Sequence, residues 1–204
     1  MFNDRYGLTE AVLSGRKTMT RRIIKAPKRI NGYDTYGFIV CQDIATHEVT
    51  GIYVRGYDGG TIDDIEILPK YEIGEVVAVA QSYRDVLAEG FESDAAVLRA
   101  FEQRRLVGWT NKMFVRPELM PHRIRITGIG VERLQDISDE DCLREGVQVL
   151  PEISRYYFER TDREEGFYFS SPCAAFAELI DRVSGRGTWD RNPYVVAYEF
   201  ELLK

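Results

Sequence analysis

Hydrophobic and polar residues alternate with a period of two in several stretches of the chain, as is typical of β-strands that bury one face. The alternation is clearest in RIRITGIGVERL, residues 123–134, where Gly128 and Gly130 are expected to allow a bend or close packing. Six further strands are predicted, in RKTMTRRII, YGFIVCQDI, TGIYVRGY, TIDDIEI, KYEIGEVVAVAQSY and NPYVVAYEFELL. The second and third of these are separated by a short polar stretch, which predicts a hairpin.

Apolar residues at helical spacing, together with capping signals, predict four helices. They are expected near residues 8–15, 93–105, 138–147 and 171–185. Ser138 precedes Asp141 by three positions, the pattern of a helix start. Gly15, Gly146 and Gly185 stand where the first, third and fourth helices are expected to end, because glycine readily adopts a left-handed conformation.

Strands outnumber helices and do not alternate regularly with them, which disfavours a doubly wound parallel sheet. The pattern instead predicts an α+β fold, a small and mostly antiparallel β-barrel decorated by helices. The chain has 204 residues and contains no internal repeat or low-complexity segment. We therefore expect a single domain over residues 1–204.

Charge is distributed unevenly. The 27 Lys and Arg residues are outnumbered by 33 Asp and Glu residues, for a net charge of -6, which argues against a protein that coats nucleic acid non-specifically. Residues 16–29 nevertheless hold seven basic residues and no acidic one: Arg16, Lys17, Arg21, Arg22, Lys25, Lys28 and Arg29. This basic run predicts a local site for an anion or for chemistry.

Lys17 and Thr20 are candidates for that chemistry. On a regular strand they would point to opposite faces, so they converge only if the backbone that leaves Gly15 is irregular. The ordinary pKa of lysine, roughly 10.4, would have to be lowered by burial or by the nearby arginines before Lys17 could act as a base. A threonine nucleophile with a lysine base is a recognised pairing. Ordinary strand threonines on a solvated basic face are the competing interpretation.

Metal and disulfide chemistry are not indicated. The three cysteines, Cys41, Cys142 and Cys173, are widely spaced, and we expect small core residues in a reducing compartment. His47 and His122 lie at no metal-ligand spacing from a cysteine or from each other, so no metal and no cofactor are predicted. The N-terminal residues do not resemble a signal peptide, and no apolar run approaches membrane length. We expect a cytoplasmic protein, in a bacterial host cytoplasm if it is phage-encoded, with no membrane partner; its oligomeric state stays open.

Four stretches resemble the ASCH domain family of the PUA-like superfamily, in its longer phage- and prophage-type branch. They are GRKTMTRR (15–22), YEIGEVVAV (71–79), RIRITGIGVERLQDISDEDCLREGV (123–147) and TWDRNPYVVAYEFELL (188–203). The resemblance implies a PUA-like β-barrel associated with RNA and nucleotide metabolism. Compared with the minimal members of the family, residues 84–121 and 148–171 look like insertions.

One branch of this family is similar to a small bacterial amidohydrolase that removes the acetyl group from N4-acetylcytidine. The resemblance implies a Lys base at Lys17, a Thr nucleophile at Thr20 and a Glu acid at Glu145, without a cofactor. The substrate would be a nucleoside or nucleotide. Residues expected to contact the substrate or a nucleic acid are Arg16, Thr18, Arg21, Arg22, Tyr83 and Trp109, the last two by stacking on the base.

Two other functions stay open. A non-catalytic module could hold RNA or single-stranded nucleic acid through the basic run, joined by Arg104, Arg105, Lys112 and Arg123. A ribonuclease is the third, and a two-histidine mechanism is disfavoured because the chain has only His47 and His122. The amidohydrolase is placed slightly ahead of pure binding.

Overall fold

The computed structural model describes residues 2–30, 32–45, 49–56, 61–89, 107–160 and 168–203. The helix expected at 93–105 lies outside the described residues, as do Arg104, Arg105 and His47.

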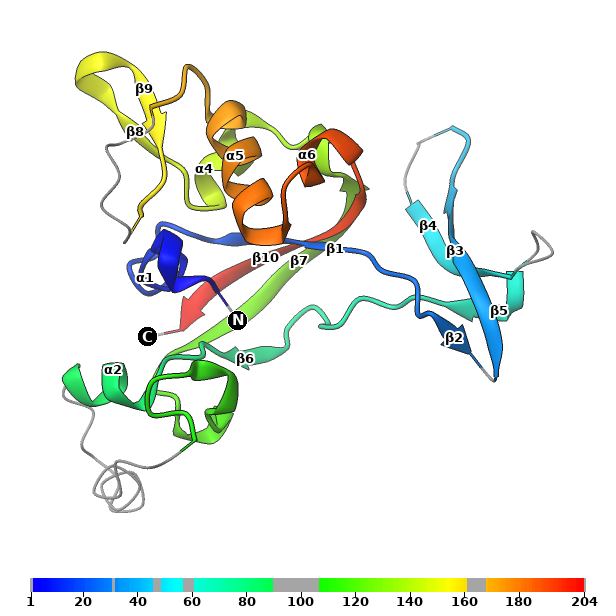
Figure 1. Cartoon of the computed structure of the whole chain (residues 1–204), viewed down its shortest axis with the longest axis horizontal. Coiled ribbons are helices and arrows are strands. Elements are labelled where there is room, and N and C mark those ends of the chain that lie inside the picture. The colour runs from blue at the N-terminus through cyan, green and yellow to red at the C-terminus, as the bar shows by residue number, and fades with distance from the viewer. Residues whose placement is uncertain are drawn as a thin grey trace.

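An antiparallel four-stranded sheet forms the centre of the molecule, in the order β1-β10-β7-β6 (Figure 1). Its strands are β1 (Met19–Ile23), β10 (Tyr194–Leu203), β7 (Arg123–Arg133) and β6 (Val76–Ala78). The register between β10 and β7 shifts between Glu199 and Phe200, beside Gly128. Such a bulge bends a strand. A Cβ on Gly128 would lie 3.3 Å from the Glu199 side chain, which confirms the close packing expected at this glycine.

A second sheet, in the order β2-β3-β4-β5, lies to one side of the first (Figure 1). Its strands are β2 (Arg29–Ile30), β3 (Tyr33–Gln42), β4 (Val49–Gly56) and β5 (Thr61–Glu66). The Phe38 ring contacts the Tyr194 ring of β10, with centroids 6.4 Å apart, and Ile52 belongs to the main hydrophobic core. The hairpin predicted from YGFIVCQDI and TGIYVRGY is confirmed as β3 and β4.

Short helices surround the central sheet (Figure 1). The α-helices are α1 (Leu8–Leu13), α2 (Tyr83–Ala88), α4 (Asp139–Arg144), α5 (Pro172–Ser184) and α6 (Thr188–Arg191). The 3-10 turns are η1 (Asp4–Tyr6), η2 (Lys112–Phe114), η3 (Pro117–Leu119), η4 (Leu134–Asp136) and η5 (Pro151–Ile153), and a hairpin joins β8 (Gln148–Leu150) to β9 (Arg155–Tyr157). In the described part of the chain, no helix is both long enough and apolar enough to cross a membrane.

The main core lies between α5 and the central sheet. Helix α5 buries Ala175, Phe176, Leu179 and Ile180, which share one face at helical spacing. Buried residues of β7 and β10, among them Ile126 and Val195, belong to the same hydrophobic cluster. A smaller cluster of Tyr83, Val86 and Met120 lies apart, where α2 packs on residues 109–120.

The expected α+β class with mostly antiparallel strands is confirmed, and the expected helix ends at Gly15, Gly146 and Gly185 all have positive φ. The strand expected in KYEIGEVVAVAQSY is shorter than predicted, because only Val76–Ala78 is extended and paired. Its last residues lead into α2 instead, since the Ser82 side chain accepts a hydrogen bond from the Asp85 N–H and caps a helix there. The β8–β9 hairpin was not predicted, because residues 151–171 show no clear periodicity.

Candidate functional site

A cleft of about 1100 Å³ runs along β1, the edge strand of the central sheet. Its walls come from the N-terminal segment, from α5 and from residues 110–113. All three proposed catalytic residues, Lys17, Thr20 and Glu145, contribute to its lining. The cleft therefore brings together Lys17 and Glu145, which lie 128 positions apart in the sequence.

Lys17 lies in the turn between α1 and β1. Gly15 has a φ of 74°, and the Lys17 N–H donates to the Ala11 carbonyl, so the chain leaves the helix before it enters the strand. The Lys17 side chain then extends across the C-terminus of α4, over Gly146, where a Cβ would lie 3.7 Å from the Lys17 Cδ. The irregular backbone that convergence requires is therefore present between Gly15 and β1.

The Lys17 amine is paired with Glu145. It donates to Glu145 Oε2 at 2.5 Å and to the Glu145 backbone carbonyl at 2.6 Å. Glu145 is the C-cap residue of α4, a helix whose N-cap is Ser138, as predicted. A cation at a helix C-terminus also interacts favourably with the helix dipole. Both side chains are almost fully buried, with exposures of 2% and 6%.

Arg21 supports the pair from the strand. Its guanidinium donates to Glu132 at 2.6 Å, to Asp141 at 3.1 Å and to Glu145 at 3.4 Å, and only 1% of the side chain is exposed. The cluster formed by Lys17, Arg21, Glu132, Asp141 and Glu145 thus combines two basic and three acidic side chains. Lys17, Arg21 and Glu145 are buried, whereas Glu132 and Asp141 are partly exposed. Oppositely charged partners offset the cost of burying the first three.

Burial has the largest effect on Lys17, and it lowers the pKa of the amine below its ordinary value of 10.5. The attraction and hydrogen bond of Glu145 oppose this shift, whereas repulsion from Arg22 and Arg21 adds to it. A lysine whose pKa is lowered loses its proton more readily than a free lysine. The arrangement therefore favours the base role expected of Lys17.

Thr20 lies on β1, opposite Tyr198 of β10. It lines both the large cleft and a smaller, mostly apolar pocket of about 30 Å³ behind it. Phe2 and Arg22 also line both cavities. In the described part of the chain no hydrogen bond joins the Thr20 hydroxyl to the Lys17 amine, which donates to Glu145 instead. Thr20 thus stands where the two cavities meet.

Of the other residues expected to bind substrate, some line the cleft and others do not. Arg22 is exposed and lines the cleft. Arg16 lies outside the lining and pairs with Glu159 at 3.2 Å. The Thr18 hydroxyl accepts a hydrogen bond from Arg144 and is likewise not part of the lining.

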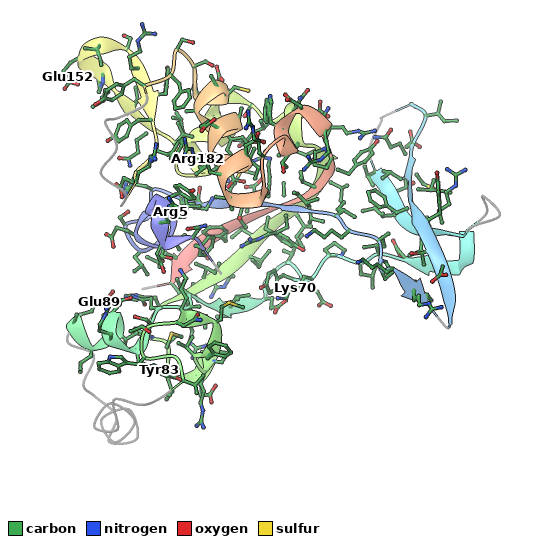
Figure 2. All side chains as sticks on the ribbon, viewed as in Figure 1. Arg5, Lys70, Tyr83, Glu89, Glu152 and Arg182 are labelled. Carbon is green, nitrogen blue, oxygen red and sulfur yellow. The ribbon has the colours of Figure 1, made fainter. Side chains whose placement is uncertain are left out.

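The two aromatic residues expected to stack on a base do not lie at the cleft. Tyr83 is 4% exposed and belongs to the small hydrophobic cluster with Val86 and Met120, against which Trp109 packs. Figure 2 shows Tyr83, the first residue of α2, on the side of the molecule away from α5. Their apolar rings stabilise the packing of α2, and the described lining of the cleft includes neither of them.

Several residues of the site were not expected from the sequence. Glu132 of β7 and Asp141 of α4 contact Arg21 and are not part of the described lining of the cleft. Arg191 lines the cleft from the end of α6, and the α5 side chains Phe176, Leu179, Ile180 and Val183 form an apolar wall. Of these features only the apolar face of α5 had a signal in the sequence, its helical spacing. The positions of the other residues depend on contacts between distant segments of the chain.

Lys112 connects two walls of the cleft. Its amine lies 2.5 Å from Asp4 Oδ1 and 2.8 Å from the Thr9 hydroxyl, which itself donates to Asp4. This contact, called the Lys112 clasp below, joins residues 110–113 to the N-terminal helix. Among the residues that the structure describes, no group of three or more His, Cys, Asp or Glu side chains is placed to hold a metal ion.

Comparisons with protein-family models, with curated proteins and with solved structures found no match to this chain.

Proposed function

We propose that this protein is a member of the ASCH family, with a PUA-like barrel whose cleft recognises a nucleobase or nucleotide and hydrolyses an N4-acylcytidine-type (deoxy)nucleoside. In this proposal the central sheet is part of the barrel, and residues 84–121 and 148–171 are insertions. The observation that carries the proposal is the buried pair of Lys17 and Glu145, which opens into a cleft that Thr20 also lines. Buried, coupled ionisable groups at a cleft are typical of catalytic sites.

In the reactive state of this proposal, Lys17 is the neutral partner and Glu145 holds the proton that the two groups share across their 2.5 Å contact. The neutral amine of Lys17 is then a base and the protonated carboxyl of Glu145 is an acid. One buried pair thus supplies both functions that amide cleavage requires.

The reaction begins when Lys17 removes the proton of the Thr20 hydroxyl and the oxygen attacks the acyl carbon. Glu145 gives its proton to the departing exocyclic amine as the C–N bond breaks. The acyl group is then an ester on Thr20, and water hydrolyses it to release a carboxylic acid. A side-chain rearrangement must precede attack, since the Lys17 amine contacts Glu145 in the free protein. Arg22, exposed at the cleft, is the candidate to stabilise the oxyanion.

A non-catalytic nucleic-acid-binding module is the second candidate. The exposed residues Arg22 and Lys25 line the cleft and could contact phosphates. Lys28 and Arg29, which complete the basic run, lie outside the lining, and Arg29 pairs with Asp34 at 2.7 Å. This division of the run favours a site for a small ligand over a continuous track for a polymer. A ribonuclease has less support, because His122 contacts Glu89 and is not part of the described lining.

The test is an HPLC assay of the purified protein with N4-acetylcytidine and a panel of N4-acylated deoxynucleosides. Wild-type turnover is expected to disappear in Thr20→Ala and Glu145→Gln and to survive, reduced, in Thr20→Ser, which keeps a hydroxyl. Thr18→Val is the matched control, because Thr18 is close in sequence but does not line the cleft. Circular dichroism of each variant establishes that it is folded. Absence of turnover by a folded wild-type protein across the panel would remove the hydrolase for these substrates.

A further inference from the structure

Basic side chains dominate the lining of the cleft. Among the described residues the lining has two acidic side chains, Asp4 and Glu145, and seven basic ones: Arg5, Lys17, Arg21, Arg22, Lys25, Lys112 and Arg191. This excess contrasts with the net charge of -6 for the whole chain. The cleft is therefore a local positive region on an acidic protein, which attracts anions.

Part of this positive charge is neutralised within the protein. Lys17 and Arg21 are paired with carboxylates, and Lys112 is paired with Asp4. Lys25 and Arg191 are different: neither forms an ion pair within the described residues, and both are exposed. Arg191 donates instead to the Thr188 hydroxyl at 3.0 Å and to the Arg186 carbonyl at 3.4 Å, two neutral partners that help to orient the guanidinium. Arg191 also interacts electrostatically with Asp181, whose pKa it helps to lower without forming an ion pair.

Strand pairing places Lys25 and Arg191 at the same end of the cleft. Ile23 pairs with Val195, and the Ile24 N–H donates to the Tyr194 carbonyl at 3.0 Å. Continuing this register brings Lys25 opposite residue 193, two positions after Arg191. Lys25 lies two residues beyond Ile23, the last residue of β1, and lines the same cleft as Thr20. The basic end and the proposed nucleophile therefore belong to one cavity.

Arg22 lies between these two ends. Because alternate residues of a strand share a face, Arg22 lies on the same face as Thr20, about 7 Å along the strand. The α5 side chains Phe176, Leu179 and Val183 form an apolar wall of the same cleft. A ligand that complements this cleft has an apolar part for the α5 wall and an anionic group for the basic side chains.

We propose that Arg22, Lys25 and Arg191 form a phosphate subsite, so that the cleft prefers a nucleotide to an uncharged nucleoside. The inference rests on the proposed recognition of a nucleobase in this cleft and adds the chemical class of the ligand. Arginine and lysine bind phosphate through charge-assisted hydrogen bonds, which are stronger than neutral ones.

The test compares the binding of cytidine and cytidine 5′-monophosphate to the wild-type protein by isothermal titration calorimetry at low salt. The monophosphate is expected to bind at least about tenfold more tightly, a difference of about 1.4 kcal/mol. The double variant Lys25→Gln/Arg191→Gln is expected to lose most of this advantage while its affinity for cytidine stays unchanged. The matched control is Lys28→Gln/Arg186→Gln, which removes the same two charges from exposed residues outside the described lining.

A second arm distinguishes a mononucleotide from a polymer, since both carry phosphate. A five-nucleotide single strand with one central cytidine is titrated at several salt concentrations. Tighter binding than the monophosphate, with a steeper dependence on salt, identifies the polymer as the phosphate source. Equal or weaker binding identifies the mononucleotide.

Equal affinities for cytidine and its monophosphate, or no binding of either, would overturn the phosphate subsite. So would an advantage that the Lys25→Gln/Arg191→Gln variant retains in full. The outcome is separable from that of the hydrolase assay. If the protein hydrolyses N4-acetylcytidine but binds cytidine and its monophosphate equally well, the hydrolase proposal stands and the phosphate subsite is wrong. If the monophosphate binds more tightly but no substrate is hydrolysed, the subsite stands and the hydrolase proposal is wrong for these substrates.

Discussion

The Lys17 amine lies 2.5 Å from the Glu145 carboxylate, and the backbones that carry the two residues are also joined. The Thr18 N–H donates to the Arg144 carbonyl at 2.9 Å, which fixes the chain after α1 against the end of α4. The pair is therefore held in position by its surroundings and does not depend on two flexible side chains meeting. Such preorganisation is what a catalytic pair requires.

Removal of Lys17 is expected to destabilise the fold through Glu145. Lys17→Met leaves a buried carboxylate whose remaining cationic contact is Arg21 at 3.4 Å, and breaking a buried pair costs about 3–5 kcal/mol. The double variant Lys17→Met/Glu145→Gln removes both charges and is expected to lose at least about 1 kcal/mol less than the sum of the two single variants. Urea denaturation of all four proteins measures this coupling. Strict additivity would contradict the pairing.

The pH dependence of stability is expected to reveal the lowered pKa of Lys17. Between that lowered pKa and the unfolded value near 10.5, the unfolded chain binds the proton and the folded protein does not. The free energy of unfolding therefore rises with pH in this window through Lys17, and the contribution is constant above it. The difference between wild type and Lys17→Met, measured by urea denaturation from pH 7 to pH 10, isolates this effect. A difference that stays flat or falls would show that the pKa is not lowered.

Substitution of the adjacent residues Arg21 and Arg22 is expected to have very different effects on stability. Arg21→Gln leaves the buried carboxylate of Glu145 and the partly exposed carboxylates of Glu132 and Asp141 without their shared guanidinium, and we expect a loss of about 3–5 kcal/mol. Arg22→Gln changes an exposed side chain and is expected to alter stability by about 0.5 kcal/mol or less while weakening binding in the cleft. Thermal denaturation compares the two. Similar losses would mean that the contacts of Arg21 are not specific.

Gly146 is expected to tolerate no side chain. Its φ is 110°, and a Cβ there would lie 3.2 Å from Leu8 and 3.7 Å from the Lys17 side chain. Gly146→Ala is expected to cost about 1–2 kcal/mol through backbone strain, and the Leu8 side chain must also shift to admit the new Cβ. Gly130→Ala is the control, because a methyl group there meets open space. Urea midpoints check both, and an equal effect of the two substitutions would argue against the strain at Gly146.

The Lys112 clasp is expected to keep one side of the cleft closed. Lys112→Met removes the contacts to Asp4 and Thr9, which join residues 110–113 to the N-terminal helix. Faster amide hydrogen exchange is therefore expected in residues 107–115 and in α1, with α5 unchanged. Lys70→Met, a change at an exposed lysine outside the described lining of the cleft, is the control. Unaltered exchange in both segments would show that packing alone holds them.

Local signals in the sequence were sufficient for much of the secondary structure. The alternation in residues 123–134 predicted β7, Gly185 predicted the end of α5, and Ser138 predicted the start of α4. These predictions succeeded because alternation, helical spacing and capping each depend on residues within a few positions of one another. The hairpin β8–β9 was not predicted because residues 151–171 show no clear periodicity. The helix α2 was not predicted because its capping residue, Ser82, lies inside the segment that was expected to be a strand.

The sequence by itself determined the residue types at the candidate site, a lysine, a threonine three positions later and a glutamate at a helix end. Only the tertiary structure decided which of them meet. It paired Lys17 with Glu145, surrounded Arg21 with three carboxylates, and divided the basic run between this charged cluster, the cleft and the second sheet. In the tertiary structure Tyr83 belongs to the small hydrophobic cluster with Val86 and Met120, and Arg191 lines the cleft. The physical reason is that burial and charge pairing depend on contacts between distant segments, which no local pattern records.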